Sequence, residues 1–231
     1  MGHEGSGVVT AAGPGVPGLA EGDHVVLSWV APCGQCRYCR AGREARCQVA
    51  ATIVAPGGTM PDGTTLLSRH GETVYHYLGV SSFAEEAVVP ASGAIKIRDD
   101  APLEVIALVG CAVATGAGAV TNTAAVEPGA QVAVIGCGGV GLSVVGLPPA
   151  GARASFEPLV LAEADQRILG SNYGSVRPAI DIPALVDRYL DGQLKLDEMV
   201  SARRPLEAAQ ASLDDLEAGQ ALRTLLIPDL R

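Results

Sequence analysis

The sequence predicts a mixed α/β protein with a β-rich first part. Up to about residue 95, short apolar runs alternate with Gly, Pro and Asp turn signals, a pattern typical of short strands. Residues 103–126 form an Ala-, Val- and Gly-rich stretch that predicts buried helix. Residues 131–135 then read as a buried strand that leads into a glycine-rich loop, which places parallel-sheet structure in the second part.

The β-rich first part predicts a small barrel rather than repeated βαβ units. Val25-Val26-Leu27 and Ala87-Val88-Val89 are two of its expected strands, and the dipeptides Pro14-Gly15 and Pro17-Gly18 are turn signals between such runs.

The last fifty residues read differently. Helical spacing predicts a helix over residues 182–192 that ends at Gly192. A second amphipathic helix is expected over residues 206–217, closed by Gly219, and a final strand over residues 222–227.

Composition narrows the class of protein. The chain has 231 residues, a net charge of −9 and only 3% aromatic residues, which suits neither phosphate backbones nor base stacking, so we expect no nucleic-acid partner. Two uncharged stretches, residues 105–126 and 129–152, contain Gly, Pro, Asn or Thr, and we interpret them as buried elements rather than membrane spans. No signal-peptide pattern opens the sequence, so we expect a reducing, cytoplasmic location.

Four of the six cysteines lie within fifteen residues, at the spacing Cys-x2-Cys-x2-Cys-x7-Cys. They are Cys33, Cys36, Cys39 and Cys47. Four thiolates satisfy tetrahedral zinc and leave no open position, so the sequence predicts a structural zinc site. Iron–sulfur ligation and two disulfides are the alternatives, although the Cys-Pro that usually continues an iron–sulfur run is absent. We expect Gly34 and Gly42 to let the loop bend, and four arginines at positions 37, 40, 43 and 46 to offset the thiolate charge.

Several motifs occur together in one order along the chain. They are Gly2-His3-Glu4-Gly5, the four-cysteine loop, Gly110-Cys111 with Thr115-Gly116-x-Gly118, Gly136-x-Gly138-Gly139-x-Gly141, and Ala221-Leu222-Arg223-Thr224. As a set they resemble the zinc-dependent medium-chain alcohol dehydrogenases, on the branch of the class III, thiol-adduct-oxidising formaldehyde dehydrogenases.

The resemblance implies a GroES-like β-rich catalytic domain and an inserted Rossmann domain of parallel sheet. We assign residues 1–122 to the catalytic domain with its structural zinc loop, 123–178 to a remnant of the NAD-binding Rossmann domain, and 179–231 to a segment that returns to the catalytic domain. The implied activity is oxidation of an alcohol to an aldehyde, with hydride transfer to NAD and with a catalytic zinc that polarises the alcohol oxygen. The substrate would be a small alcohol or a thiol adduct.

The resemblance also implies roles for single residues. His3 and Cys111 correspond to ligands of the catalytic zinc, and Glu4 to the carboxylate beside it. Thr115 falls near the nicotinamide and Arg223 near the cofactor pyrophosphate. The glycine loop of Gly136, Gly138, Gly139 and Gly141 would hold that pyrophosphate at a helix N-terminus.

The chain departs from the family pattern in two places. The family's first zinc-ligand cysteine lies upstream of the histidine motif, so we expect an incomplete catalytic site, on an N-terminus that frays. After Gly141 only four residues precede Gly146-Leu147-Pro148-Pro149, which in the family closes the fifth strand. Strands two to four and the ribose carboxylate are therefore expected to be missing, and Glu157 and Glu163 stand in the wrong context to replace it. We expect impaired activity.

Three alternatives stay open. The chain could be a non-catalytic zinc-binding remnant that pairs with itself or with an intact homologue. Residues 158–162, with 167–170, resemble the family's subunit-pairing segment, so we expect a homodimer. The terminal amine, two backbone amides and His3 would also suit Cu(II) or Ni(II). The sequence does not choose between NAD and NADP.

Overall fold

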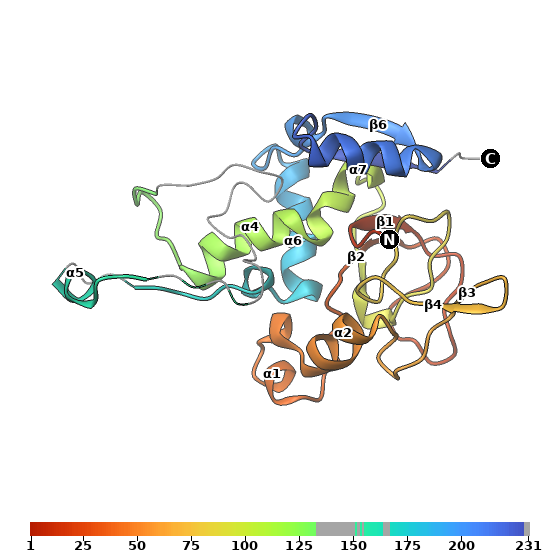
Figure 1. The fold of residues 1–231 in the computed structure, drawn as a ribbon, viewed down its shortest axis with the longest axis horizontal. Helices are drawn as coiled ribbons and strands as arrows, with labels where there is room; N and C mark the ends of the chain where they lie inside the picture. The colour runs from red at the N-terminus through yellow and green to blue at the C-terminus, as the bar shows by residue number, and fades with distance from the viewer. Residues whose placement is uncertain (133–150, 152, 154, 164–166, 229–231) are drawn as a thin grey trace.

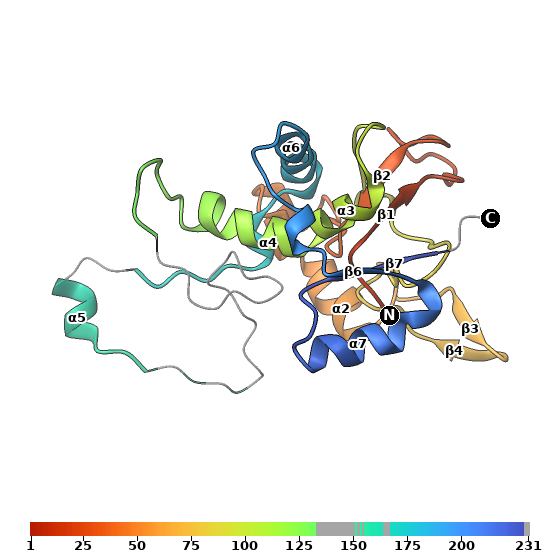
Figure 2. The same ribbon diagram turned by 90° about the horizontal axis from the view of Figure 1, so that it is seen from above.

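The computed structural model describes residues 1–132, 151, 153, 155–163 and 167–228. Two helices, α4 (Ala112–Gly118) and α6 (Pro178–Leu190), run through its middle (Figure 1). A small antiparallel sheet lies on one side of these helices. Two strands of the C-terminal tail lie beside α7 (Ala209–Glu217), as Figure 2 shows from above.

The front of the chain forms a three-stranded antiparallel sheet in the order β1-β2-β5. Its strands are β1 (Gly5–Val8), β2 (His24–Leu27) and β5 (Ala94–Lys96). Val26 stands opposite Ser6 and Ile95, and its side chain is fully buried. The expected strand at Val25-Val26-Leu27 is therefore confirmed.

The front is less regular than the sequence predicted. Besides this sheet, the described residues hold only one further front pair, the exposed hairpin of β3 (Leu67–Arg69) and β4 (Glu72–Val74), and no closed barrel. The expected strand at residues 87–89 is wrong, because this segment is irregular and Val88 is 65% exposed. These three apolar residues have no neighbouring strand with which to form backbone hydrogen bonds, so they do not form a strand.

Short helical turns connect these strands. They are α1 (Arg37–Arg40), η1 (Glu44–Arg46), η2 (Ala50–Val54), α2 (Ala55–Gly57) and η3 (Ala91–Gly93).

The apolar stretch after residue 102 is helical, as predicted. It consists of α3 (Leu103–Ile106), η4 (Ala107–Gly110), α4 and η5 (Ala119–Thr123). Val105, Ile106 and Val109 are buried in the core. In the described part of the chain, no single helix has the length and hydropathy of a membrane span. Among the described helices, one pair, Leu103–Gly110 and Ala112–Thr123, passes that test together, and it is bent by 53°.

The chain returns to α4 through η6 (Tyr173–Ser175). Gly174 has φ +62°, and a Cβ there would lie 2.4 Å from the Ala114 carbonyl oxygen, so only glycine fits this close packing. Just before η6, the hydroxyls of Thr123 and Ser171 lie 2.9 Å apart. The two ends of residues 124–170 therefore meet beside α4.

Within that interval, α5 (Pro158–Glu163) stands apart from the other helices in both views (Figures 1 and 2). The Leu159 side chain is 61% exposed.

The tail agrees closely with its prediction. Helix α6 begins four residues before the predicted start, because Pro178 suits the first turn and the Asp181 carboxylate accepts a hydrogen bond from the Arg177 N–H at 2.6 Å. The chain continues through η7 (Asp197–Met199), β6 (Ala202–Pro205), η8 (Leu206–Ala208), α7 and β7 (Thr224–Ile227). Strands β6 and β7 pair in parallel.

The expected Rossmann strand and the glycine loop lie almost wholly outside the described residues. Only Gln131 and Val132 of that strand are described, and both are irregular and exposed. The parallel pair that the structure does describe belongs to the tail.

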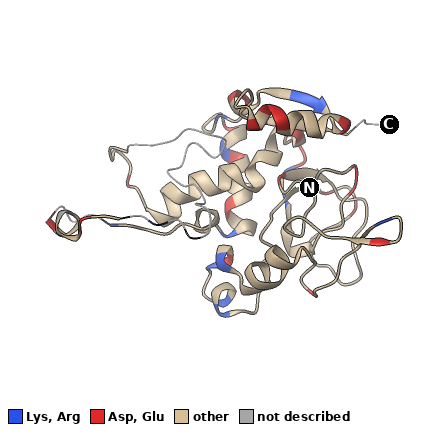
Figure 3. Ribbon diagram, in the orientation of Figure 1, with Lys and Arg blue, Asp and Glu red and all other residues tan. Residues whose placement is uncertain are grey.

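Charge is unevenly distributed. Figure 3 shows Lys and Arg gathered at α1 and the turn after it, whereas Asp and Glu mark α7. The cysteine loop is cationic, as expected.

Candidate functional site: two groups of metal-binding side chains

The cysteine loop brings its four thiols together. The Sγ atoms of Cys33, Cys36, Cys39 and Cys47 all lie within 4.8 Å of one another. Cys36 Sγ is 3.5 Å from Cys39 Sγ, and Cys33 Sγ is 3.9 Å from Cys39 Sγ. Zinc–sulfur bonds of about 2.3 Å in a tetrahedron place the sulfurs about 3.8 Å apart. The four thiols therefore fit a closed structural zinc site.

Local backbone geometry builds this site. Gly34 and Gly42 have φ values of +70° and +67°, so they turn the chain as expected. Backbone N–H groups point at the sulfurs, with Cys33 Sγ accepting from the Cys36 N–H at 3.3 Å. The Cys39 N–H, the largest cause, lowers the pKa of Cys36 to about 6, while burial raises the pKa of Cys39 to about 12. The N–H groups thus favour thiolate at the loop's more open edge, as a zinc ligand requires.

A second group joins the N-terminal segment to the start of α4. Ligand atoms of His3, Glu4 and Cys111 all lie within 4.8 Å of one another. His3 and Glu4 precede β1, and Cys111 lies at the bend between η4 and α4. These three side chains suit a zinc ion with one open position, which is the arrangement of catalytic zinc sites.

The N-terminal segment is held in place, contrary to the expected fraying. The Ser82 N–H donates to the Gly2 carbonyl and the Phe83 N–H to the Met1 carbonyl, both at 3.0 Å. The Ser82 hydroxyl also donates to the Glu4 carbonyl at 2.7 Å. This anchoring places the His3 ring beside Glu4 and Cys111, and at 5.6 Å from the Tyr77 ring.

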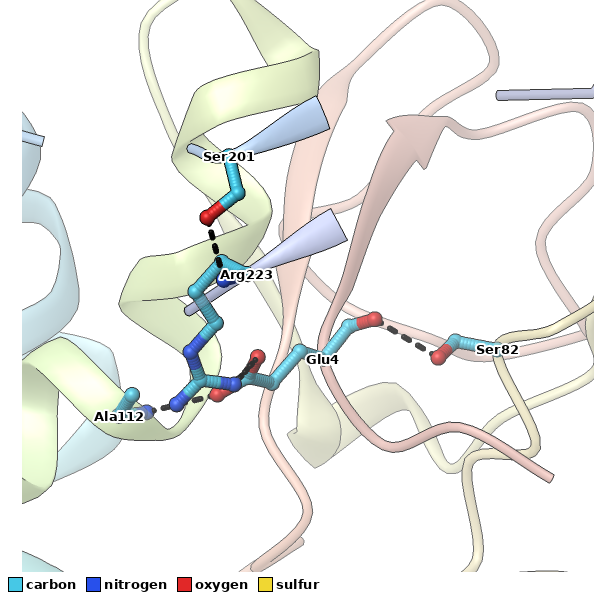
Figure 4. A network of polar contacts seen from close by, with 5 residues as sticks. All are labelled: Glu4, Ser82, Ala112, Ser201 and Arg223. Carbon is cyan, nitrogen blue, oxygen red and sulfur yellow. Dashed lines mark hydrogen bonds and ion pairs between the residues drawn. The ribbon is translucent and has the colours of Figure 1, made fainter. Parts of the chain in front are cut away.

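The Glu4 carboxylate is the centre of a polar network (Figure 4). Glu4 Oε1 accepts from the Ala112 N–H at 2.9 Å, and Glu4 Oε2 pairs with Arg223 Nη1 at 2.7 Å. The Ser201 hydroxyl accepts from the Arg223 backbone N–H at 3.4 Å. Arg223, expected near the pyrophosphate, thus contacts the carboxylate of the zinc-ligand group, and its cofactor role stays a prediction.

Burial governs the protonation of the three candidate ligands. It lowers the pKa of His3, helped by the Arg223 charge, so the imidazole is neutral and able to bind a metal. Burial raises the pKa of Glu4, against the opposing effects of Arg223 and the Ala112 N–H. Burial and then the Glu4 charge raise the pKa of Cys111 to about 12. A cation at this position would stabilise both the thiolate and the carboxylate.

Thr115 lies one helical turn after Cys111, where its N–H donates to the Cys111 carbonyl at 2.8 Å. Its hydroxyl contacts the Cys111 thiol and lowers the pKa of that group. The expected phosphate-binding glycines Gly136, Gly138, Gly139 and Gly141 lie outside the described residues.

Sequence reasoning missed three residues that surround Cys111: Ser28, Trp29 and Tyr173. The Tyr173 hydroxyl donates to the carbonyl of Gly110, directly before Cys111, and lies 3.2 Å from Ser28 Oγ. The Tyr173 and Trp29 rings are 5.0 Å apart. Trp29 could have been noticed as the only tryptophan, four residues before the cysteine loop. No spacing signal places Tyr173 there.

Comparison with known proteins is consistent with this geometry. Residues 1–99 match the alcohol dehydrogenase GroES-like domain family. The S-(hydroxymethyl)glutathione dehydrogenase of Synechocystis sp. is 48% identical over 145 residues, which cover 63% of this chain and 39% of that protein. The class-3 alcohol dehydrogenase of Dictyostelium discoideum is 28% identical over 314 residues, covering 98% of this chain and 82% of that protein. Because that alignment is longer than the chain, part of the relative has no counterpart here.

Solved structures show the same fold. An alcohol dehydrogenase zinc-binding domain protein from Burkholderia ambifaria has a TM-score of 0.92 at 29% identity, covering 100% of this chain and 84% of that one. The benzyl alcohol dehydrogenase of Acinetobacter calcoaceticus has a TM-score of 0.85 at 25% identity, covering 99% and 83%. Zinc and NAD(H) fit this family of oxidoreductases, which act on small molecules. The chain belongs to the zinc-dependent medium-chain alcohol dehydrogenases, on the class III-like branch.

Proposed function

We propose that this chain carries the zinc-binding half of an alcohol dehydrogenase, with a structural zinc at the four cysteines and a catalytic zinc at His3, Glu4 and Cys111. The observation that carries the proposal is the convergence of these last three side chains within 4.8 Å. The proposed substrate is a primary alcohol or the thiol adduct of an aldehyde, and NAD is the proposed hydride acceptor. The names of the class III-like relatives support the thiol adduct.

The chain's own residues prepare this site for alcohol oxidation. A zinc ion held there supplies a Lewis acid that polarises the alcohol oxygen and lowers its pKa. The neutral His3 ring and the Cys111 thiolate would hold the metal. The Ala112 N–H and Arg223 hold the Glu4 carboxylate beside them in the metal-free protein, and Glu4 would leave Arg223 to become the third ligand. The Thr115 hydroxyl contacts the Cys111 thiol, and it would relay the proton that the alcohol loses by giving up its own proton as it receives that one.

We further propose that turnover by this chain is impaired. Hydride transfer needs nicotinamide fixed against the alcohol carbon, and the ribose carboxylate expected after a complete second strand is not found in the sequence. The excess length of the class-3 alignment over this chain supports the loss of an internal segment.

A second candidate function is a non-catalytic zinc protein that self-associates as a homodimer. The complete four-cysteine site favours it, because that site needs nothing outside residues 33–47. The exposed Leu159, Ile168 and Leu169 side chains support self-association near α5.

Metal analysis and a coupled NADH assay test these proposals. The purified chain should hold one zinc tightly, and a second more weakly when zinc is supplied, because Glu4 must leave Arg223 to bind the metal. The second zinc should disappear in Cys111→Ser and remain in Cys36→Ser that has been refolded with excess zinc. NADH formation from alcohol should be undetectable in the chain as given.

Restoring the missing strands should recover NADH formation that depends on Cys111. A chain that never binds a second zinc would refute the catalytic site and leave the non-catalytic function. Cys111-dependent turnover by the chain as given would refute the proposed impairment.

A further inference from the structure

A buried histidine, His76, closes the base of the exposed β3–β4 hairpin. Its side chain is 5% exposed and follows β4, opposite the residues that precede β3. Its Nε2 atom accepts a hydrogen bond from the Leu66 N–H at 3.2 Å, and its own backbone N–H donates to the Gly58 carbonyl at 2.7 Å. His76 thus joins the start of the hairpin to the end of α2.

The strands themselves add little to the attachment of this hairpin. Every residue of β3 and β4 is exposed, so the two strands bury no apolar side chain in the core. In both views the pair projects from the rest of the molecule (Figures 1 and 2). Segments with few buried contacts open at a low cost in free energy. The attachment of the hairpin therefore depends on the hydrogen bonds at its base.

The hydrogen bond from Leu66 requires a neutral His76 ring. A backbone N–H can donate only to a ring nitrogen that carries no proton, so Nδ1 carries the single proton of the ring. Nδ1 is buried and has no hydrogen-bond partner among the described residues. A second proton, on Nε2, would face the Leu66 N–H and leave a charge buried without a partner. Burial accordingly lowers the pKa of His76.

Charged neighbours do not offset this burial. Burial is the one cause of the lowered His76 pKa within the described part of the chain, and α2 carries no charged residue. The Asp62 carboxylate is occupied by the Thr64 N–H and hydroxyl, and Glu4 pairs with Arg223. The titratable and charged groups on the hairpin and on the N-terminal segment are His3, Glu4, Asp62, Arg69, His70 and Glu72.

The segment that follows His76 reaches the candidate metal site. The ring of Tyr77, the next residue, lies 5.6 Å from the His3 ring. Ser82 and Phe83, whose N–H groups hold the first residues of the chain, continue the same segment. Opening at His76 would therefore loosen the start of the segment that anchors His3.

We propose that His76 is a pH-sensitive switch, which holds the β3–β4 hairpin closed while its ring is neutral and releases the hairpin when Nε2 takes up a proton. The open hairpin exposes a ring with the ordinary pKa of 6.5, whereas the closed hairpin holds a ring with a lower pKa. The stability of the closed form is therefore complete above pH 6.5 and is lost as the pH falls from that value through the lower pKa of the closed form.

Limited proteolysis measures this opening, because cleavage of a folded segment tracks the population of its open form. A glutamate-specific protease should cut after Glu72 about five- to tenfold faster at about pH 5.5 than at about pH 7.5. Each rate is divided by that of the cut after the exposed Glu198 in the same sample, which removes the pH dependence of the protease itself.

Two substitutions separate titration from a merely structural role. His76→Gln keeps an oxygen that can accept from Leu66 but does not titrate, so its cleavage ratio should be the same at both pH values. His76→Leu removes the acceptor, and Glu72 should be cut at the faster rate at both pH values. The matched control is His70→Gln, at the exposed turn between β3 and β4, which should keep the pH dependence of the parent.

Nitrogen spectra of ring-labelled protein give a second readout on the parent chain. The histidine signal that is missing from His76→Gln should show an unprotonated Nε2 at neutral pH and should take up its proton below pH 6.5. A protonated Nε2 at neutral pH, or a parent cleavage ratio that does not change with pH, would overturn the switch, as would a His76→Gln ratio that changes as the parent's does. Neither measurement needs a second zinc, so this inference is tested separately from the proposed catalytic site.

Discussion

Arg223→Leu should destabilise the protein by leaving the Glu4 carboxylate buried without its cation. The Glu4 and Arg223 side chains are only 16% and 21% exposed, so this ion pair resembles a buried pair more than an exposed one. Removing one partner of a buried pair costs about 3–5 kcal/mol, and an exposed pair is worth about 0–1 kcal/mol. Because the Ala112 N–H still donates to Glu4, we expect about 2–3 kcal/mol at neutral pH.

Thermal unfolding of the protein that holds only the four-cysteine zinc is the assay, because the Arg223–Glu4 pair is intact in that form. A loss of that size should lower the Tm by about 5–10 °C for a chain of this length. The matched control is Arg203→Leu, whose partner Glu104 lies at 3.0 Å but where both side chains are 49% exposed. That control should change stability by about 0.5 kcal/mol or less. Equal losses in the two variants would refute the buried pair as a stabilising contact.

The pH dependence of the Arg223→Leu loss has a definite sign. Burial raises the folded-state pKa of Glu4 above its ordinary 4.5, so the Glu4 contribution to stability is largest at acidic pH and falls as pH rises through the folded pKa. Without Arg223 that pKa rises further. The difference in unfolding free energy between variant and parent should therefore shrink on acidification, because protonation removes the Glu4 charge in both proteins. A difference that grows on acidification would contradict this account.

Three further predictions concern other parts of the chain. Cys36→Ser should lose the tightly bound zinc by metal analysis and lower the Tm, whereas Cys111→Ser should keep that zinc, because structural zinc contributes folding free energy. Gly174→Ala should destabilise by more than about 1 kcal/mol in urea unfolding, because its Cβ would meet the Ala114 carbonyl and its φ is positive. The chain should form a dimer or larger species by light scattering, and Leu159→Ser should shift it toward monomer; a monomer at micromolar concentration would contradict this.

The parts of the site that the sequence predicted are those encoded locally. The four cysteines lie within one loop, so their spacing alone specifies a tetrahedral group, and the glycines at 34 and 42 bend it as expected. Helix α6 was predictable for the same reason, since its apolar periodicity and Gly192 lie within one stretch, although the helix begins at Pro178 rather than at the predicted residue 182.

What the sequence left open depends on long-range contacts. The pairing of Arg223 with Glu4 joins residues 219 positions apart, and Tyr173 reaches Gly110 across 63. Neither contact leaves a periodic or spacing signal in the sequence. Anchoring of residues 1–4 was missed likewise, because its donors lie at Ser82 and Phe83. The family resemblance predicted that His3, Glu4 and Cys111 belong to one site, but it did not identify the residues that hold them there.

The hydrogen bond between Thr123 and Ser171 has a consequence for how such a chain changes in evolution. It holds residues 123 and 171 together, so the two ends of the interval 124–170 are fixed by the rest of the fold. The entropy of closing a loop depends on the logarithm of its length, at about 0.6 kcal/mol for each doubling. Inserts of different lengths therefore differ little in how much they destabilise the rest of the fold. Both zinc-ligand groups lie outside the interval, so whole cofactor-binding segments can be gained or lost there as exchangeable modules.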